Sequence, residues 1–163
     1  MDSTLLPNVP YLTSRAHKVF ALAHDIADRL GHDVSPVHLT IAILRHNGVP
    51  AGALYNLRVP LDKLENEVSH ELPVAGPARP VPKDRAWTPW DHQMIERARV
   101  EARVLGTEFY SSEHLLLALL RDDEGTPAKI LAKFGVRYDD LRREIASGYE
   151  RRPDDPGQSS PVT

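Results

Sequence analysis

The chain has 163 residues, 41% of them hydrophobic and 26% charged, with a formal net charge of −3. This composition is typical of one globular domain, and no apolar run approaches the roughly 18–20 residues of a membrane-spanning helix. The small negative charge excludes general attraction to nucleic acid, and the absence of cysteine excludes disulfides and thiolate sites. The first ten residues contain Asp2 and no Lys or Arg, which fits no signal peptide. We therefore expect a cytoplasmic protein.

Prolines divide the chain into segments with helical periodicity. Proline is tolerated in the first turn of a helix, and no run of β-branched or aromatic residues alternates as a strand would. The sequence therefore predicts an all-α fold. The predicted helices, in chain order, cover residues 14–30, 37–46, 50–57, 60–72, 90–105, 111–121, 127–134 and 138–145.

The second half of the chain repeats the first. Leu30-Gly31 recurs as Leu105-Gly106 at an offset of 75, and His38-Leu39 recurs as His114-Leu115 at an offset of 76. From Gly48-Val49-Pro50, matched by Gly125-Thr126-Pro127, the offset is 77. Each one-residue change falls in a loop, as expected for a duplication.

This pattern predicts two tandem four-helix repeats, because four short helices bury little apolar surface alone. We expect the two repeats to pack with pseudo-twofold symmetry. The proline-punctuated stretch between them is predicted to be an extended linker, and the polar tail to be disordered. The predicted divisions are an N-terminal extension (1–11), repeat one (12–72), the linker (73–86), repeat two (87–149) and the tail (150–163).

Several motifs resemble the N-terminal domain of Clp unfoldases, especially of the ClpC type. The opening Thr13-Ser14-Arg15-Ala16, the segment Ser111-Ser112-Glu113-His114-Leu115 and the stretch from Glu124-Gly125 to Gly135-Val136 match motifs of that family. The resemblance covers residues 12–149. It implies an all-α module of the bacterial cytoplasm that binds substrates, adaptors or tagged proteins for an ATP-driven unfoldase and its protease.

The phosphate-binding loop of an ATPase is absent, since no Gly-x-x-x-x-Gly-Lys-Ser/Thr occurs. We therefore expect no enzymatic activity and no cofactor. The expected partners are Clp unfoldase or protease subunits and substrate or adaptor proteins, but neither nucleic acid nor a membrane. The sequence leaves open whether the chain is a free-standing competitor or a piece of a longer unfoldase.

Glu113 is the sharpest candidate for a binding residue. A carboxylate in the first turn of a helix is stabilised by the helix dipole, which explains it without any ligand. The resemblance implies instead that Glu113 pairs with the guanidinium of phosphoarginine, while the helix start formed by Ser111, Ser112 and His114 receives the phosphate. The first repeat has lost this pattern, because Ser35-Pro36-Val37-His38 replaces it and supplies no carboxylate.

Other candidate sites are weaker. Trp87 either packs in the core against the linker or, as the resemblance implies, belongs to a pocket for peptide antibiotics. That second reading gives the alternative function, a protein that sequesters peptide-like inhibitors of the unfoldase.

The eight histidines have no metal-binding spacing, so we expect no metal and place them on the surface or at helix starts. Residues 87–145 hold nine basic and eleven acidic side chains, which disfavours a DNA-binding helix.

Overall fold

The computed structural model describes residues 6–151, and this part contains eight α-helices and no β-strand. The predicted all-α class is confirmed. The helices are α1 (Ser14–Arg29), α2 (Pro36–Arg45), α3 (Val49–Asn56), α4 (Leu61–Ser69), α5 (Pro89–Leu105), α6 (Ser112–Arg121), α7 (Thr126–Lys133) and α8 (Tyr138–Arg151).

Helix boundaries agree with the predicted ones to within one or two residues, except at the ends of α4 and α8. Helix α4 ends at Ser69, three residues before Leu72. Helix α8 continues past Ile145, its predicted end, to Arg151. The first two residues of the predicted tail are therefore helical, and the rest of that prediction concerns residues 152–163, outside the described part of the chain.

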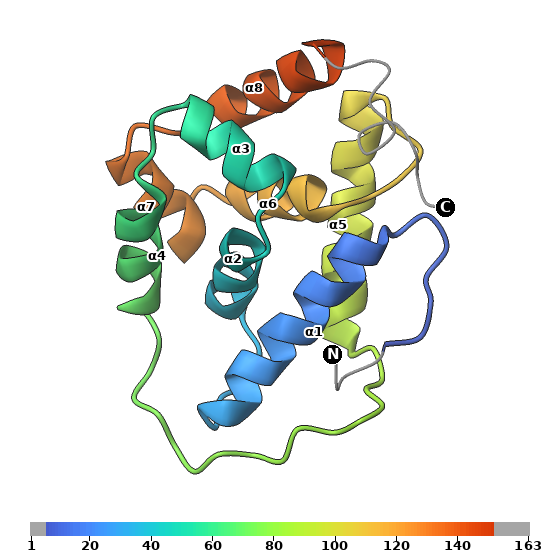
Figure 1. The fold of residues 1–163 in the computed structure, drawn as a ribbon, viewed down its shortest axis with the longest axis vertical. Helices are drawn as coiled ribbons and strands as arrows, with labels where there is room; N and C mark the ends of the chain where they lie inside the picture. Colours follow the sequence, from blue (N-terminus) through green and yellow to red (C-terminus); the bar gives the residue numbers. More distant parts are fainter. Residues whose placement is uncertain (1–5, 152–163) are drawn as a thin grey trace.

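The eight helices pack with the expected pseudo-twofold symmetry (Figure 1). Within each repeat the first and second helices form the closest pair, α1 with α2 and α5 with α6. Between repeats the contacts are reciprocal, because α3 packs on α8 as α7 packs on α4, and α2 contacts α7 as α6 contacts α3. The two repeats therefore share one core.

Helices α2 and α6 run through the centre of this core. Every residue from Val37 to Leu44 and from Ser112 to Leu120 is buried, although the second segment begins with three polar side chains. Burying a leucine or isoleucine side chain contributes about 1.5–3 kcal/mol, so these two helices supply much of the driving force for folding. The polar start of α6 is consequently held in a fixed environment.

The linker runs along the outside of the molecule and is fixed to the end of α1 (Figure 1). The N–H of Gly76 donates to the carbonyl of Leu30 at 2.8 Å, and the N–H of Arg79 donates to that of Asp28 at 2.7 Å. Gly31 permits this approach, because it has a φ of +69° and a Cβ there would lie 2.5 Å from the carbonyl oxygen of Pro77.

Candidate protein-binding site

The start of α6 brings together the predicted residues Ser111, Ser112, Glu113 and His114 on one helical turn, and all four are buried. The ring Nδ1 of His114 accepts a hydrogen bond from the N–H of Ser111 at 2.8 Å. Burial lowers the pKa of His114, which keeps the imidazole neutral and able to accept this bond. The hydroxyl groups of Ser111 and Thr13 lie 2.5 Å apart, so the segment before α1 fixes the helix start.

Glu113 is 3% exposed and is covered by Tyr149 from the last turn of α8. The tyrosine hydroxyl donates a hydrogen bond to Oε2 of Glu113 at 2.6 Å. Burial, together with the charge of Glu113, raises the pKa of Tyr149, so the phenol remains a donor. Within residues 6–151, no Lys or Arg side chain forms an ion pair with Glu113.

Ser112 adds a second unusual feature to this turn. Its side chain is 1% exposed, and its hydroxyl oxygen has no hydrogen-bond partner in the described part of the chain. A buried hydroxyl without a partner costs about 1–3 kcal/mol. The helix start thus combines a buried carboxylate that lacks a cation with a buried hydroxyl that lacks a partner.

The equivalent turn in the first repeat has an apolar side chain at the position where the second repeat has the Glu113 carboxylate. Val37 replaces Glu113, and the offset of 77 places Leu72 where the second repeat has Tyr149. Ser35 donates to or accepts from Nδ1 of His38 at 2.8 Å, and Nε2 of His38 lies 3.1 Å from Nδ1 of His32. This turn keeps a hydrogen-bonded helix start but offers no carboxylate.

Trp87 makes the contacts of a packing residue, although its partners are not the linker. Its indole N–H donates to the carbonyl of Pro7 at 2.8 Å. The ring packs edge-on against Phe20 and His17 of α1, with centroid distances of 5.2 and 5.6 Å. These contacts are to α1 and the N-terminal segment rather than to α6.

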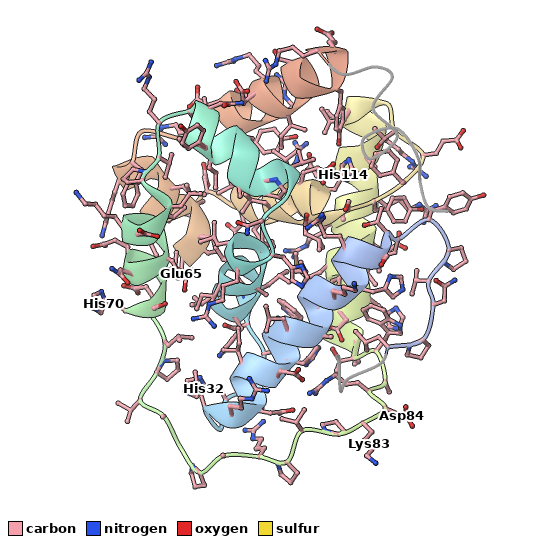
Figure 2. All side chains as sticks on the ribbon, in the orientation of Figure 1. His32, Glu65, His70, Lys83, Asp84 and His114 are labelled. Atoms are coloured by element: carbon pink, nitrogen blue, oxygen red, sulfur yellow. The ribbon has the colours of Figure 1, made fainter. Side chains whose placement is uncertain are left out.

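Placing the histidines on the surface or at helix starts was wrong for two of them. His24 and His32 lie outside the helix starts and are buried, each with a polar partner. His38 and His114 do lie at helix starts but are buried as well. His32 and His114 lie in separate regions of the molecule (Figure 2). Among residues 6–151, no three His, Asp or Glu side chains gather as metal ligands would.

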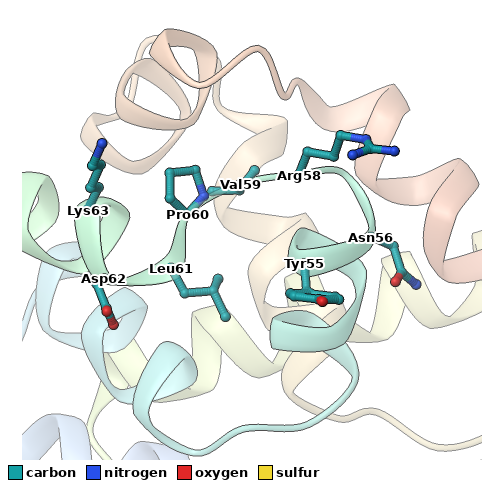
Figure 3. Close-up of a pocket in the computed structure, with 8 residues that line it drawn as sticks. All are labelled: Tyr55, Asn56, Arg58, Val59, Pro60, Leu61, Asp62 and Lys63. Carbon is teal, nitrogen blue, oxygen red and sulfur yellow. The ribbon is translucent and has the colours of Figure 1, made fainter.

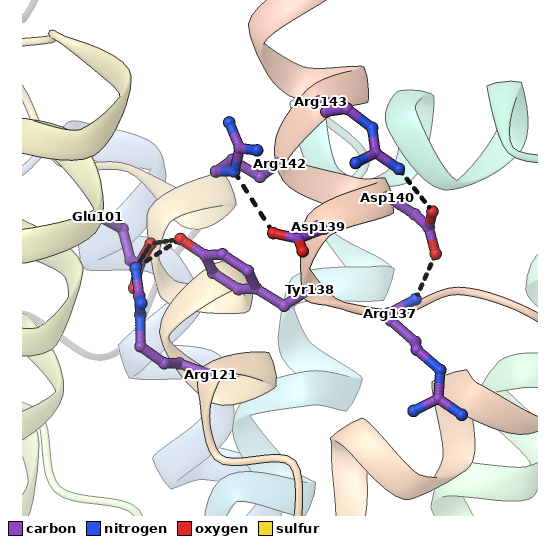
Figure 4. A network of polar contacts seen from close by, with 8 residues as sticks. All are labelled: Glu101, Arg121, Arg137, Tyr138, Asp139, Asp140, Arg142 and Arg143. Atoms are coloured by element: carbon purple, nitrogen blue, oxygen red, sulfur yellow. Dashed lines mark hydrogen bonds and ion pairs between the residues drawn. The ribbon is translucent and has the colours of Figure 1, made fainter.

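Sequence reasoning missed a buried network on α5, α6 and α8 (Figure 4). Glu101 is 1% exposed and pairs with Arg121, whose Nε lies 2.6 Å from its Oε2. The hydroxyl of Tyr138 also donates to Glu101, and Arg121 lies over the Tyr138 ring at 4.5 Å. Burial and the neighbouring Glu101 raise the pKa of Tyr138 to about 12. No local spacing indicates this network, because it joins three helices.

Two surface hollows lie outside the α6 helix start. One, of about 890 Å³, follows the bend between α3 and α4 from Tyr55 to Lys63 (Figure 3). The other, of about 300 Å³, lies between α5 and α6 beside Val100, Ala118 and Arg121. Neither is lined by a residue that the sequence singled out.

The fold and the paired helix starts define a class of tandem-repeat helical domains, and comparison with known proteins gives its family. The profile of the Clp repeat N-terminal domain matches residues 11–126 and 87–163. The chain therefore belongs to the Clp repeat N-terminal domain family. Members of this family are substrate- and adaptor-binding modules of Clp chaperones. None of the described helices is long and apolar enough to cross a bilayer.

Relatives of known sequence are much longer proteins. The chain is 34% identical over 135 residues to the Bacillus subtilis "Negative regulator of genetic competence ClpC/MecB" and 33% identical over 135 residues to the ClpB chaperone of Oceanobacillus iheyensis. Each match covers 82% of this chain and 16% of the relative, so the chain spans about one sixth of their length.

Solved structures share the fold at low sequence identity. The Hsp104 N-terminal domain of Candida albicans superposes with a TM-score of 0.66 at 19% identity, covering 88% of this chain and 93% of that one. The N-terminal domain of ClpD from Arabidopsis thaliana superposes with a TM-score of 0.60 at 18% identity, covering 86% and 95%.

Proposed function

We propose that the chain is a non-catalytic, cytoplasmic docking module that presents substrates or adaptors to a Clp unfoldase or competes for them, and that it recognises arginine-phosphorylated proteins at the start of α6. Family membership supports the first part. The second part depends on Glu113, a buried carboxylate in the first turn of a buried helix with no cation paired to it among the described residues.

The chemistry of this turn suits the two halves of phosphoarginine. A carboxylate pairs well with the planar N–H fork of a guanidinium. The free N–H groups at a helix start favour an anion, and the unpartnered hydroxyl of Ser112 adds a further donor for a phosphate oxygen. Phosphoarginine carries both groups on one side chain, so a single turn of helix can recognise it.

Sequestration of peptide-like inhibitors at Trp87 receives less support. The indole N–H already donates to the carbonyl of Pro7, and the ring already packs against His17 and Phe20. A ligand at this position would have to displace the N-terminal segment. We therefore place the binding function at α6 and not at Trp87.

Isothermal titration with free phosphoarginine tests the proposal. We expect one site per chain, and Glu113→Ala should weaken binding roughly ten- to a hundredfold, because a hydrogen bond to a charged group contributes about 1.5–3 kcal/mol. Val37→Ala is the matched control in the first repeat and should bind like the wild type. Two equivalent sites, or an unaffected Glu113→Ala variant, would contradict recognition at α6.

A capture experiment tests the docking role separately. The immobilised wild-type protein should retain Clp subunits or their substrates from a lysate of the source organism. If it retains neither and also binds no phosphoarginine, the docking role is wrong. Titration with ATP should give no binding, since no phosphate-binding loop is present in the sequence.

A further inference from the structure

We propose that Tyr149 completes the guanidinium site at Glu113, where its hydroxyl holds the carboxylate and its ring covers the guanidinium of the ligand. This inference rests on the proposed recognition of phosphoarginine. It assigns Tyr149 as the residue that sets the affinity of the site, a role that the α6 motif alone does not indicate.

The Glu101 network shows how this protein binds a guanidinium at a buried glutamate (Figure 4). Arg121 contacts both Glu101 oxygens, at 2.6 and 3.2 Å, and its Nη2 donates to the hydroxyl of Tyr138 at 2.6 Å. Its guanidinium plane lies over the same tyrosine ring, at 4.5 Å. The carboxylate, the guanidinium and the tyrosine hydroxyl thus form hydrogen bonds with one another.

The start of α6 holds two of these three components. Glu113 is as buried as Glu101, and its tyrosine also comes from α8, with a hydroxyl–carboxylate distance of 2.6 Å. The guanidinium is the missing component, because no Arg or Lys of the described residues pairs with Glu113. A phenol compensates a buried carboxylate less than a guanidinium does. A ligand guanidinium can therefore join Tyr149 at Glu113, as Arg121 joins Tyr138 at Glu101.

Tyr149 packs at the edge of the core, where a ligand would enter beside it. It lies in the last turn of α8, next to Gly148, whereas the buried apolar residues of α8 are Leu141 and Ile145, one or more turns earlier. Its ring packs edge-on against Phe109, with a centroid distance of 6.5 Å. The last turn of a helix has unpaired carbonyl groups and opens most easily.

The first repeat shows what happens when this pair is absent. Leu72 and Val37 replace Tyr149 and Glu113, so the phenol and the carboxylate are both missing from that repeat. The tyrosine and the glutamate therefore occur together in the second repeat and are absent together from the aligned positions of the first. Leu72 lies outside α4, which ends at Ser69, so this correspondence is one of sequence.

The test compares the affinities of four proteins for free phosphoarginine: the wild type, Tyr149→Phe, Tyr149→Leu and, as a control, Tyr138→Phe. Tyr149→Phe keeps the ring and removes the hydroxyl that holds the carboxylate, so it should bind roughly two- to tenfold more weakly, the value of one hydrogen bond. Tyr149→Leu also removes the ring that would lie over the guanidinium, so it should bind more weakly than Tyr149→Phe. Tyr138→Phe makes the same chemical change at Glu101 and should leave the affinity unchanged.

The outcomes separate this inference from the proposed function. Equal or tighter binding by a folded Tyr149→Phe variant, together with loss of binding in Glu113→Ala, would overturn the role of Tyr149 and leave recognition at α6 standing. Absence of phosphoarginine binding by all four proteins would overturn both. Circular dichroism of each variant establishes that the affinities compare folded proteins.

Discussion

The imidazole Nε2 of His24 lies 2.9 Å from both carboxylate oxygens of Asp91, and both side chains are buried. Asp91 also accepts a hydrogen bond at 2.9 Å from the N–H of Thr88, the N-cap residue of α5. One carboxylate therefore caps a helix of the second repeat and satisfies a histidine of the first. This pair joins α1 of the first repeat to α5 of the second.

Replacing Asp91 by alanine should destabilise the protein by about 3 kcal/mol. Loss of a helix cap costs about 1 kcal/mol, and a buried imidazole without its partner adds about 1–3 kcal/mol. Denaturation by urea measures the effect. The control is Asp62→Ala, which removes an exposed carboxylate from the first turn of α4 and should cost less than about 0.5 kcal/mol.

Alanine should be tolerated worse at Gly31 than at Gly106. Both glycines end the first helix of a repeat with positive φ, so either substitution strains the backbone by about 1–2 kcal/mol. Only at Gly31 would the new Cβ meet the linker, 2.5 Å from the oxygen of Pro77, while at Gly106 no atom lies within 4 Å. Gly31→Ala should therefore cost at least about 1 kcal/mol more, and it should speed proteolysis of residues 73–86. Equal losses in the two variants would show that the linker contact contributes nothing.

Acid should destabilise the protein through His38. Burial, followed by the nearby His32 and His24, lowers the pKa of His38 to about 4. Because the unfolded chain takes up the proton near pH 6.5, the free energy of unfolding should be constant above that pH. It should fall between pH 6.5 and 4, by at most about 1.4 kcal/mol per pH unit from this group.

His38→Gln should flatten this pH dependence, although His114, whose pKa is also lowered, keeps part of it. The exposed His70 provides the control, since His70→Gln should leave the slope as in the wild type. Urea denaturation at intervals of half a pH unit measures both. A steeper slope in the His38 variant would reverse the assigned sign.

Arg121→Met should destabilise the protein by about 3 kcal/mol, because it leaves Glu101 buried without its cation. The matched control is Arg143→Met, which breaks the more exposed pair with Asp140 at 3.1 Å and should cost less than about 1 kcal/mol. Thermal and urea unfolding measure both variants. Similar losses would mean that Glu101 is satisfied by Tyr138 alone.

The fold could be predicted from the sequence because its signals are local or repeated. Helical periodicity and prolines place the helices, and the recurring Leu-Gly and His-Leu pairs define the two repeats. The end of α8 could not be placed, because Gly148 is typical of a helix end. The helix continues through it because Tyr149, one residue later, packs against Phe109 and binds Glu113.

The candidate site could be predicted only as far as its own helical turn. The capping pattern places Ser111 and Glu113 at the start of a helix. Their partners lie far away in sequence, since Thr13 is 98 residues before Ser111 and Tyr149 is 36 residues after Glu113. Periodicity indicates which face of a helix is buried, but not which residue of another helix meets it.

The reciprocal packing of α3 on α8 and of α7 on α4 has a consequence for how the chain is held together. Each half supplies interior surface to the other, so the molecule is equivalent to a dimer whose two subunits have been fused end to end. A single cut in the exposed linker should therefore leave two complementary fragments that stay associated at micromolar concentration. Either fragment made alone should remain unfolded until the other is added, as expected when half of an interior is missing.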